Sequence, residues 1–208
     1  MPGADLRRCD LRPLSLATLD LNGADMRRAT LAGMQLGGGP DGPRTNFRRV
    51  RLDRADLTAV LFGDIDLTGV SFRRAHMRRT GFEDASLTGA DLWRADLRGA
   101  DFGLSGIAGA DFQRADLRAA TFRSTDGADP GFSTDFRRAN LTGAQITIAS
   151  LAGARFERAN LTGADLSGTD FTGARFTRAK LAGVTWSDTT CPDGTNSDAN
   201  GGTCLGHL

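Results

Sequence analysis

The stretch Arg138-Ala139-Asn140-Leu141-Thr142-Gly143-Ala144 decides the fold, because it returns letter for letter twenty residues later as Arg158-Ala159-Asn160-Leu161-Thr162-Gly163-Ala164. A looser copy, Arg178-Ala179-Lys180-Leu181-Ala182-Gly183-Val184, follows after twenty more. A repeat at a fixed period indicates an architecture in which each repeat stacks on the next.

A finer period lies inside each twenty residues, because a large apolar residue recurs at every fifth position. We call this residue the centre. Centres run from Leu6 to Leu36, from Phe47 to Phe122 and from Phe136 to Trp186, 34 in all, and each is Leu, Phe, Met, Ile or Trp. Ala occupies 20 of the 34 positions two residues before a centre. Small residues there suit a narrow interior that large side chains already fill.

A five-residue period fits neither an α-helix nor a flat strand. On a helix, five residues advance a centre by about 140°, so the centres would point in every direction. On a straight strand, each step of five would move the centre to the opposite surface. A chain that turns one corner per pentad instead points every centre toward one axis. Four pentads then close a square, which predicts 8 to 9 coils and a rod roughly 40 Å long at the spacing of stacked strands.

The pentads Ala90-Asp91-Leu92-Trp93-Arg94 and Ala164-Asp165-Leu166-Ser167-Gly168 resemble the A(D/N)Lxx motif of the pentapeptide repeat family, and the resemblance covers about residues 4 to 186. It implies an all-β fold, the right-handed quadrilateral β-helix. It implies no single function, since members include proteins that shield DNA gyrase from quinolones or peptide toxins and many without an assigned role. The gyrase-protecting members are typically strongly acidic dimers joined through a C-terminal helix, whereas this chain has a net charge of +1 and a Cys-containing tail.

The pattern divides the chain into a β-helix over residues 1–186 and a polar tail over 187–208. Two interruptions, at about residues 37–45 and 124–134, are predicted to leave the coil as loops. The first is rich in Gly and Pro but lacks the Gly-Lys-Ser/Thr that ends a phosphate-binding loop, so we interpret it as a plain excursion. Phe132, the one Phe outside the set of centres, is expected to pack against a coil face, with an exposed binding position as the alternative.

Composition gives little support for catalysis. The 26 basic residues nearly balance the 25 acidic ones, and the chain has two His, His76 and His207. No nucleophile motif or pair of isolated carboxylates stands out from the regular Asp columns, so we predict no catalytic, cofactor or metal site and no small-molecule substrate. The chain as given shows no signal peptide and no transmembrane segment.

Two Arg ladders are expected on the coil surface. They comprise Arg54, Arg74, Arg94 and Arg114 on one face, and Arg78, Arg98 and Arg118 on the next. Asp91 and Asp111 flank the ladder that starts at Arg54, and Asp56, Asp96 and Asp116 flank the ladder that starts at Arg78. One interpretation is therefore a solvated face stabilised by charge pairs. The alternative is a basic face that binds phosphates or an acidic protein, with Trp93 as an anchor. Farther along, Asn140 and Asn160 are placed to hydrogen-bond along the stack.

The tail contains Cys191 and Cys204, which flank a loop rich in Gly, Asn and Asp. We predict a disulfide between them. Two metal sites compete with it: zinc on Cys191, Cys204 and His207, and calcium on Asp193, Asn196, Asp198 and Asn200. A disulfide favours an oxidising compartment, whereas a chain without a signal peptide is cytoplasmic by default, so the sequence leaves the localisation unassigned.

Together these features predict a non-enzymatic scaffold that binds a macromolecular partner, a protein or a polyanion, through its β-helix faces. Two alternatives stay open: protection of DNA gyrase or topoisomerase by mimicry of DNA, and binding of nucleic acid or an anionic polymer by the Arg ladders. The first coil is expected to leave part of its core open, which suggests a fraying coil, a partner or a homodimer through that end. Cys9, in that coil, is interpreted as a small buried hydrophobe.

Overall fold

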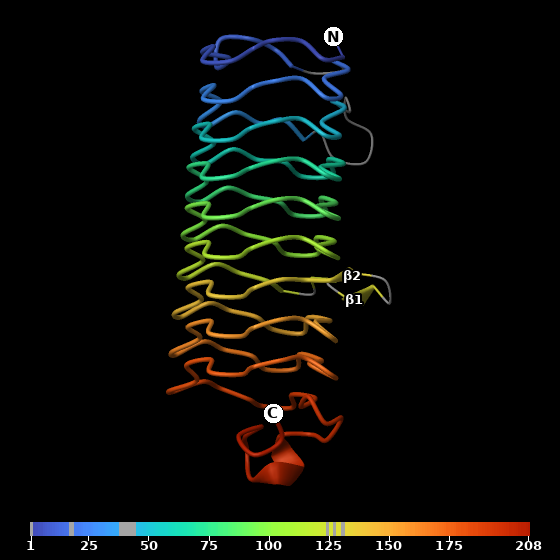
Figure 1. The fold of residues 1–208 in the computed structure, drawn as a ribbon, viewed down its shortest axis with the longest axis vertical. Coiled ribbons are helices and arrows are strands. Elements are labelled where there is room, and N and C mark those ends of the chain that lie inside the picture. Colours follow the sequence, from blue (N-terminus) through green and yellow to red (C-terminus); the bar gives the residue numbers. More distant parts are fainter. Residues whose placement is uncertain (1, 17–18, 38–44, 124, 127, 130–131) are drawn as a thin grey trace.

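The computed structural model describes residues 2–16, 19–37, 45–123, 125–126, 128–129 and 132–208. Its chain winds into a rod of stacked coils, with the N-terminus at one end and a tail folded beneath the other (Figure 1). Three short elements are named: strands β1 (Ala128–Asp129) and β2 (Phe132–Ser133), and the 3-10 helix η1 (Asp198–Asn200). Among the described residues, none lies in a helix long and apolar enough to cross a membrane.

Parallel bridges between coils hold the rod together, and they form four ladders along its length. We call the two longest the first and second ladders. The first contains Asp5, Asp25, Arg51, Ser71, Asp91, Asp111, Asp135, Arg155 and Arg175, and the second contains Asp10, Thr30, Asp56, His76, Asp96, Asp116, Asn140, Asn160 and Lys180. Each residue of these two ladders immediately precedes a centre. The result is the quadrilateral β-helix that the five-residue period predicts.

Each pentad ends in a tight turn that starts at the centre. In the turn after Leu92, the backbone N–H of Ala95 donates to the carbonyl of Leu92 at 3.0 Å. The third residue of the turn, two after the centre, has a positive φ in almost every pentad, as the third residue of a type II turn does. Glycine adopts this conformation without steric cost, and 12 of the glycines two residues after a centre have φ between 64° and 74°.

The centres line one continuous core. From Leu11 to Phe176 the described centres are 5% exposed or less. Phe rings on successive coils stack nearly parallel: the centroids of Phe82 and Phe102 are 4.8 Å apart, and those of Phe102 and Phe122 are 4.7 Å apart. These separations match the spacing of neighbouring strands, so the Phe102 ring contacts the one above and the one below.

Where Thr replaces Ala two residues before a centre, its hydroxyl donates inside the core. Thr80 donates to the carbonyl of Leu57 at 2.9 Å, Thr45 to that of Leu16 at 2.7 Å, and Thr169 to that of Ile146 at 2.7 Å. A buried hydroxyl is tolerated when it has an acceptor. Thr therefore substitutes for Ala in this interior without an unpaired polar group.

Both interruptions of the pattern appear as longer steps along the ladders. The ladder step is 20 residues within most of the rod, but it is 26 from Asp25 to Arg51 and 24 from Asp111 to Asp135. Most of the first interruption lies outside the described residues. The second contains β1 and β2, which pair antiparallel as a short ribbon beside the rod (Figure 1). The predicted packing of the Phe132 side chain lies outside what the structure describes.

The tail covers the end of the core below Trp186. Thr190 pairs with Asn196 in an antiparallel bridge, and the Ser197 hydroxyl donates to the carbonyl of Trp186. The predicted disulfide between Cys191 and Cys204 is present, with both residues fully buried. The tail thus closes this end of the rod as a capping repeat does. At the other end, Leu6 and Cys9 are only partly buried against the core, so Cys9 is less buried than expected.

Candidate binding face

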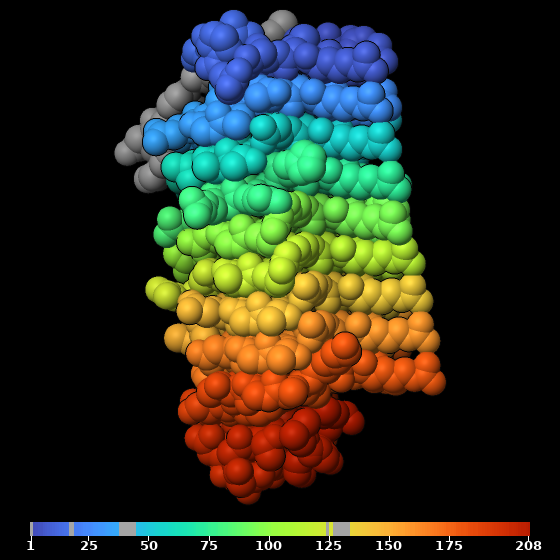
Figure 2. All heavy atoms as spheres, turned by 90° about the vertical axis from the view of Figure 1, so that its left-hand side faces the viewer, coloured from blue at the N-terminus to red at the C-terminus, as the bar shows by residue number. Residues whose placement is uncertain are grey.

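One corner of the rod carries Arg at the same place in every coil. These residues stand two positions after the centre that follows each first-ladder residue, and we call them the Arg column: Arg8, Arg28, Arg54, Arg74, Arg94, Arg114, Arg138, Arg158 and Arg178. All nine are exposed, and all nine have φ between 56° and 63°. At the strand spacing of about 4.8 Å the column runs for roughly 38 Å. The coils that carry the column stack as parallel rows along the rod (Figure 2).

The sequence predicts only part of this column as one ladder. Arg54, Arg74, Arg94 and Arg114 were expected to stack, the repeated stretch places Arg138, Arg158 and Arg178 in one column as well, and the structure joins the two sets into one line. Arg8 and Arg28 join it across the first interruption, because the 26-residue step from Asp25 to Arg51 keeps them in register. Counting positions from each centre, rather than along the chain, would have identified both.

The predicted charge pairing of this ladder is wrong. Within the described part of the chain, none of the nine Arg side chains is in an ion pair with a carboxylate. Asp91 instead accepts from Nε of Arg73 at 2.6 Å, and Asp111 accepts from the backbone N–H of Gln113 at 2.8 Å. The Arg column is therefore a line of exposed cations without carboxylate partners in these ranges.

Arg residues one position nearer the centre behave differently, because they bend back across it. Arg27 contacts Asp25 at 2.6 Å, Arg137 contacts Asp135 at 2.7 Å, and both pairs are two residues apart in sequence. The Asp precedes the centre and the Arg follows it, so the two side chains leave the same surface side by side. One residue further, the turn carries the side chain away from that Asp.

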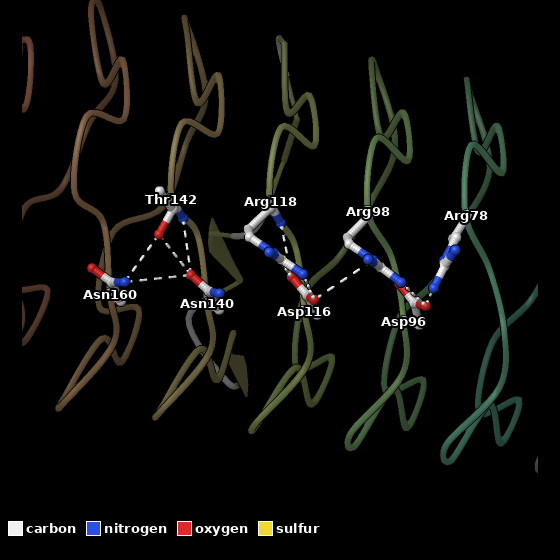
Figure 3. Close-up of polar contacts among 8 residues, drawn as sticks. All are labelled: Arg78, Asp96, Arg98, Asp116, Arg118, Asn140, Thr142 and Asn160. Carbon is white, nitrogen blue, oxygen red and sulfur yellow. Dashed lines mark hydrogen bonds and ion pairs between the residues drawn. The ribbon is translucent and has the colours of Figure 1, made fainter.

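The second ladder shows the paired arrangement over three coils (Figure 3). Asp96 accepts from Nε of Arg78 at 2.7 Å and from Nε and Nη2 of Arg98, each at 2.7 Å. Asp116 accepts from Nη2 of Arg118 at 2.7 Å, and it lies 3.6 Å from Nε of Arg98. The predicted pairing is confirmed for Asp96 and Asp116. Asp56 differs, since it accepts the backbone N–H of Thr58 at 3.1 Å.

Beyond Arg118 the same ladder changes from charged to neutral side chains (Figure 3). Nδ2 of Asn160 donates to the hydroxyl of Thr142 at 2.9 Å and lies 3.5 Å from Oδ1 of Asn140. Thr142 in turn donates to Asn140 at 2.7 Å. The predicted Asn contact is confirmed, but Thr carries most of the bonding. The second ladder is thus internally satisfied along this stretch.

Trp93 lies in the middle of the Arg column, where its ring is surrounded by guanidinium groups. The carbon atoms of these groups lie 4.4 Å from the ring centroid for Arg94, 5.1 Å for Arg74 and 5.6 Å for Arg73. Such distances are within the range of cation–π attraction. Trp93 is half-buried, so the part of the ring left outside sits among cations.

Two grooves adjoin the Arg column on either side of Trp93. The larger, of about 900 Å³, lies toward the N-terminus and is lined by Asp5, Arg7, Arg8, Arg27, Arg28, Asp53, Arg54, Arg73, Arg74 and Trp93. The smaller, of about 540 Å³, lies toward the C-terminus and is lined by Trp93, Gln113, Arg114, Arg137, Arg138, Arg155, Glu157 and Arg158. Trp93 and the Arg column thus form one elongated basic surface.

The pKa of the Asp111 carboxyl reflects the electrostatic environment beneath this surface. Burial, as the largest cause, raises the pKa of its carboxyl above the ordinary value, and the nearby carboxylates of Asp135 and Asp91 raise it further. The hydrogen bonds from Gln113 act in the opposite direction. An adjacent guanidinium in contact would lower this pKa, so the direction of the shift agrees with an Arg column that points away.

The disulfide excludes the zinc site considered from the sequence. Both sulfurs are in the disulfide and are not thiolates, and among the described residues no cluster of three His, Cys, Asp or Glu could hold a metal ion. Asp193 accepts from Thr195 at 2.7 Å and contacts Nδ1 of His207 at 2.6 Å. Hydrogen bonds from Thr195, followed by that from His207, lower the pKa of Asp193 to about 2. These contacts hold the tail closed.

Comparison with known proteins gives a consistent result for the repeat. The model of pentapeptide repeats matches in 8 copies, over residues 65–103 and 149–187. No curated protein matches the chain. Similar solved structures include HetL, a pentapeptide repeat protein involved in heterocyst differentiation regulation from the cyanobacterium Nostoc sp. strain PCC 7120, with 24% identity and a TM-score of 0.43 over 93% of this chain and 92% of that one.

Two further structures are similar to the chain. QnrB1, a plasmid-mediated fluoroquinolone resistance protein, has 19% identity and a TM-score of 0.43 over 86% of this chain and 88% of that one. Rfr23, from the cyanobacterium Cyanothece 51142, has 20% identity and a TM-score of 0.31 over 77% and 85%. Likenesses this low carry no argument about function.

Proposed function

We propose that this chain, a pentapeptide repeat protein by its match to the repeat model, is a non-enzymatic scaffold that binds a polyanionic partner along the Arg column. The observation that carries the proposal is the column itself: nine exposed Arg side chains without an ion pair among the described residues. A line of uncompensated cations is the electrostatic feature that attracts phosphate or sulfate groups.

Backbone conformation supports the proposal, because Arg is energetically unfavourable at these positions. Left-handed φ costs most residues other than glycine about 1 kcal/mol, and the equivalent positions on the other corners hold Gly 12 times among the described residues. The Arg column contains no Gly. Neighbouring cations at the strand spacing of about 4.8 Å also repel by about 1 kcal/mol in water. Two unfavourable terms at every coil support a role for the side chains outside the fold, and a bound polyanion would offset the repulsion.

Mimicry of DNA, the alternative considered from the sequence, is less well supported. A mimic needs columns of free carboxylates, whereas Asp25, Asp96, Asp116 and Asp135 each hold an Arg. A supercoiling assay with DNA gyrase and a quinolone tests this alternative, and restored supercoiling in the presence of the protein would favour it over the polyanion.

The experiment for the proposal measures retention of the protein on immobilised long-chain polyphosphate as the salt concentration rises. The variant Arg114→Gly/Arg138→Gly removes two cations from the column at positions where glycine is favoured. Its matched control is Arg49→Gly/Arg79→Gly, because these Arg are also exposed and have φ of 56° and 55°, but lie on other corners. Both variants change the net charge by the same amount.

We expect the retention of the wild-type protein to weaken as the salt concentration rises. The control variant should elute at the same salt concentration as the wild type, and the Arg column variant at a clearly lower one. Equal elution of the two double variants would show that net charge, and not the Arg column, determines binding. Absence of retention at low salt would contradict the proposed function.

A further inference from the structure

The shape of the Arg column points to the kind of polyanion that fits it. We propose that the partner is single-stranded nucleic acid, laid along the column with a base against Trp93. This inference rests on the proposed function. Three observations carry it: the straightness of the column, the place of Trp93 within it, and the uniformity of its cations.

The column follows a straight rod, and a duplex does not present its phosphates in a straight line. Each strand of B-DNA winds once around the axis in about 34–36 Å, which is close to the roughly 38 Å length of the column. A duplex lying along the rod would therefore bring each strand's phosphates to the column at about one place. A single strand has free backbone rotations, so its successive phosphates can follow the line and meet Arg from Arg8 to Arg178.

Trp93 distinguishes a nucleic acid from other flexible polyanions. The position directly after the centre on this corner is otherwise polar in every coil: Arg7, Arg27, Asp53, Arg73, Gln113, Arg137, Glu157 and Thr177. An aromatic ring in that row has no counterpart, and it stands between the two grooves. Proteins that bind single strands without sequence preference combine a basic track with aromatic rings on which bases stack. Polyphosphate and sulfated polysaccharides have no aromatic bases to stack.

The cations around Trp93 are compatible with this role. Arg74 and Arg94 contact the ring but make no ion pair in the residues that the structure describes, so their guanidinium groups are free to turn toward phosphates. Guanidinium planes also stack on bases. The same corner thus supplies both kinds of contact that a single strand requires, the charge along its length and the ring at its midpoint.

The test measures fluorescence anisotropy with three probes at low salt: fluorescein-labelled dT20, a labelled duplex of 20 base pairs and labelled polyphosphate. The proteins are the wild type, Trp93→Leu and the control Arg49→Gly/Arg79→Gly, each checked for folding by its thermal unfolding. We expect dT20 to bind at least about tenfold more tightly than the duplex. We expect Trp93→Leu to weaken dT20 roughly tenfold, and to leave the affinity for polyphosphate unchanged.

The salt dependence gives a second readout. The logarithm of the dT20 affinity should fall linearly with the logarithm of salt concentration, with a slope of about −0.7 for each phosphate contacted. If dT20 and the duplex bind equally, or if Trp93→Leu weakens polyphosphate and dT20 alike, the single-strand inference is overturned while polyanion binding stands. If none of the three probes binds, both proposals fail.

Discussion

The Arg column and the Arg residues beside the second ladder lie on neighbouring corners of one rod. Their places in the pentad differ by a single position. Arg78, Arg98 and Arg118 stand one residue after a centre and are held by Asp96 and Asp116. Arg of the column stand two residues after a centre, where φ is positive, and the structure gives them no carboxylate partner in its described ranges. The position within the turn, and not the residue type, decides whether an Arg stabilises the rod or faces outward.

This difference separates stability from recognition on one scaffold. We call the corner that carries Arg78, Arg98 and Arg118 the paired corner. It is nearly neutral and internally bonded, so a ligand would have to break ion pairs to bind there. The Arg column has its charge available, because its side chains make no ion pair among the described residues and only Arg74 and Arg94 contact the Trp93 ring. Changes in the core should affect both corners, whereas changes in the ladder or the column should affect one.

The largest expected effect comes from the core that both corners share. Phe112 is fully buried, and its ring stacks on that of Phe136 at 4.9 Å. Phe112→Ala should reduce the free energy of unfolding by about 3–5 kcal/mol, because it removes buried contacts and leaves a cavity. Urea denaturation checks this, with Trp93→Leu as a control that leaves the core intact. A loss of under ~1 kcal/mol would mean that the interior collapses around the gap.

The next effect concerns the paired corner. Asp96→Asn removes the carboxylate that holds both Arg78 and Arg98, so we expect a loss of about 1–2 kcal/mol in the free energy of unfolding, smaller at high salt. Asp84→Asn is the control, since Asp84 is exposed, has a φ of 58° and is in no ion pair within the described residues. Equal stabilities of the two variants would show that the ladder contributes nothing.

A smaller effect of opposite sign is expected at the Arg column. Arg158→Gly relieves the left-handed strain and the repulsion between neighbours, although glycine loses more entropy on folding. The net change should be a gain of about 0.5 kcal/mol. Arg118→Ala, on the paired corner, should instead lose stability. Thermal unfolding of the two variants measures both signs, and a loss of stability in Arg158→Gly would mean that the column supports the fold.

Much of this comparison follows from the sequence, and the rest does not. The five-residue period predicts the core, because the large residue of each pentad must be buried and one register within each of the three blocks achieves that for all 34 centres. It also places Arg98 and Arg118 on a ladder beside Asp96 and Asp116. Turn geometry is what the pattern lacks. The two Arg positions of a pentad are adjacent in sequence, and only the positive φ of the second turns its side chain away from the Asp.

The tail shows the same division. Two Cys and a loop of Gly, Asn and Asp predict a disulfide, and the structure contains it. That the tail covers Trp186, through Ser197 and the bridge from Thr190 to Asn196, could not be predicted, because it depends on how a non-repeating segment meets the last coil. The structure of one repeat predicts that of the next, whereas the cap occurs once and has no copy in the sequence from which to predict it.

The smallest expected effect tests whether the Arg column really points away from the carboxylates beneath it. Burial raises the pKa of Asp111 above its ordinary value, so the folded protein holds the proton more tightly than the unfolded chain does. The sign follows: the protonated form favours folding, and this contribution to stability is lost as pH rises through the folded pKa. Asp5 and Asp10 act oppositely, because hydrogen bonds from Arg7 and Arg12 lower their pKa values to about 2.

Asp111→Asn should therefore raise the melting temperature at neutral pH, and the difference from the wild type should disappear in acid, where Asp111 is protonated in both states. Melting curves from about pH 3 to pH 7 measure this, with Asp84→Asn as the matched exposed change. If Asp111→Asn lowered the melting temperature at neutral pH, a guanidinium of the column would have to be pairing with that carboxylate. The Arg column would then resemble the paired corner, and the contrast on which the binding proposal rests would be lost.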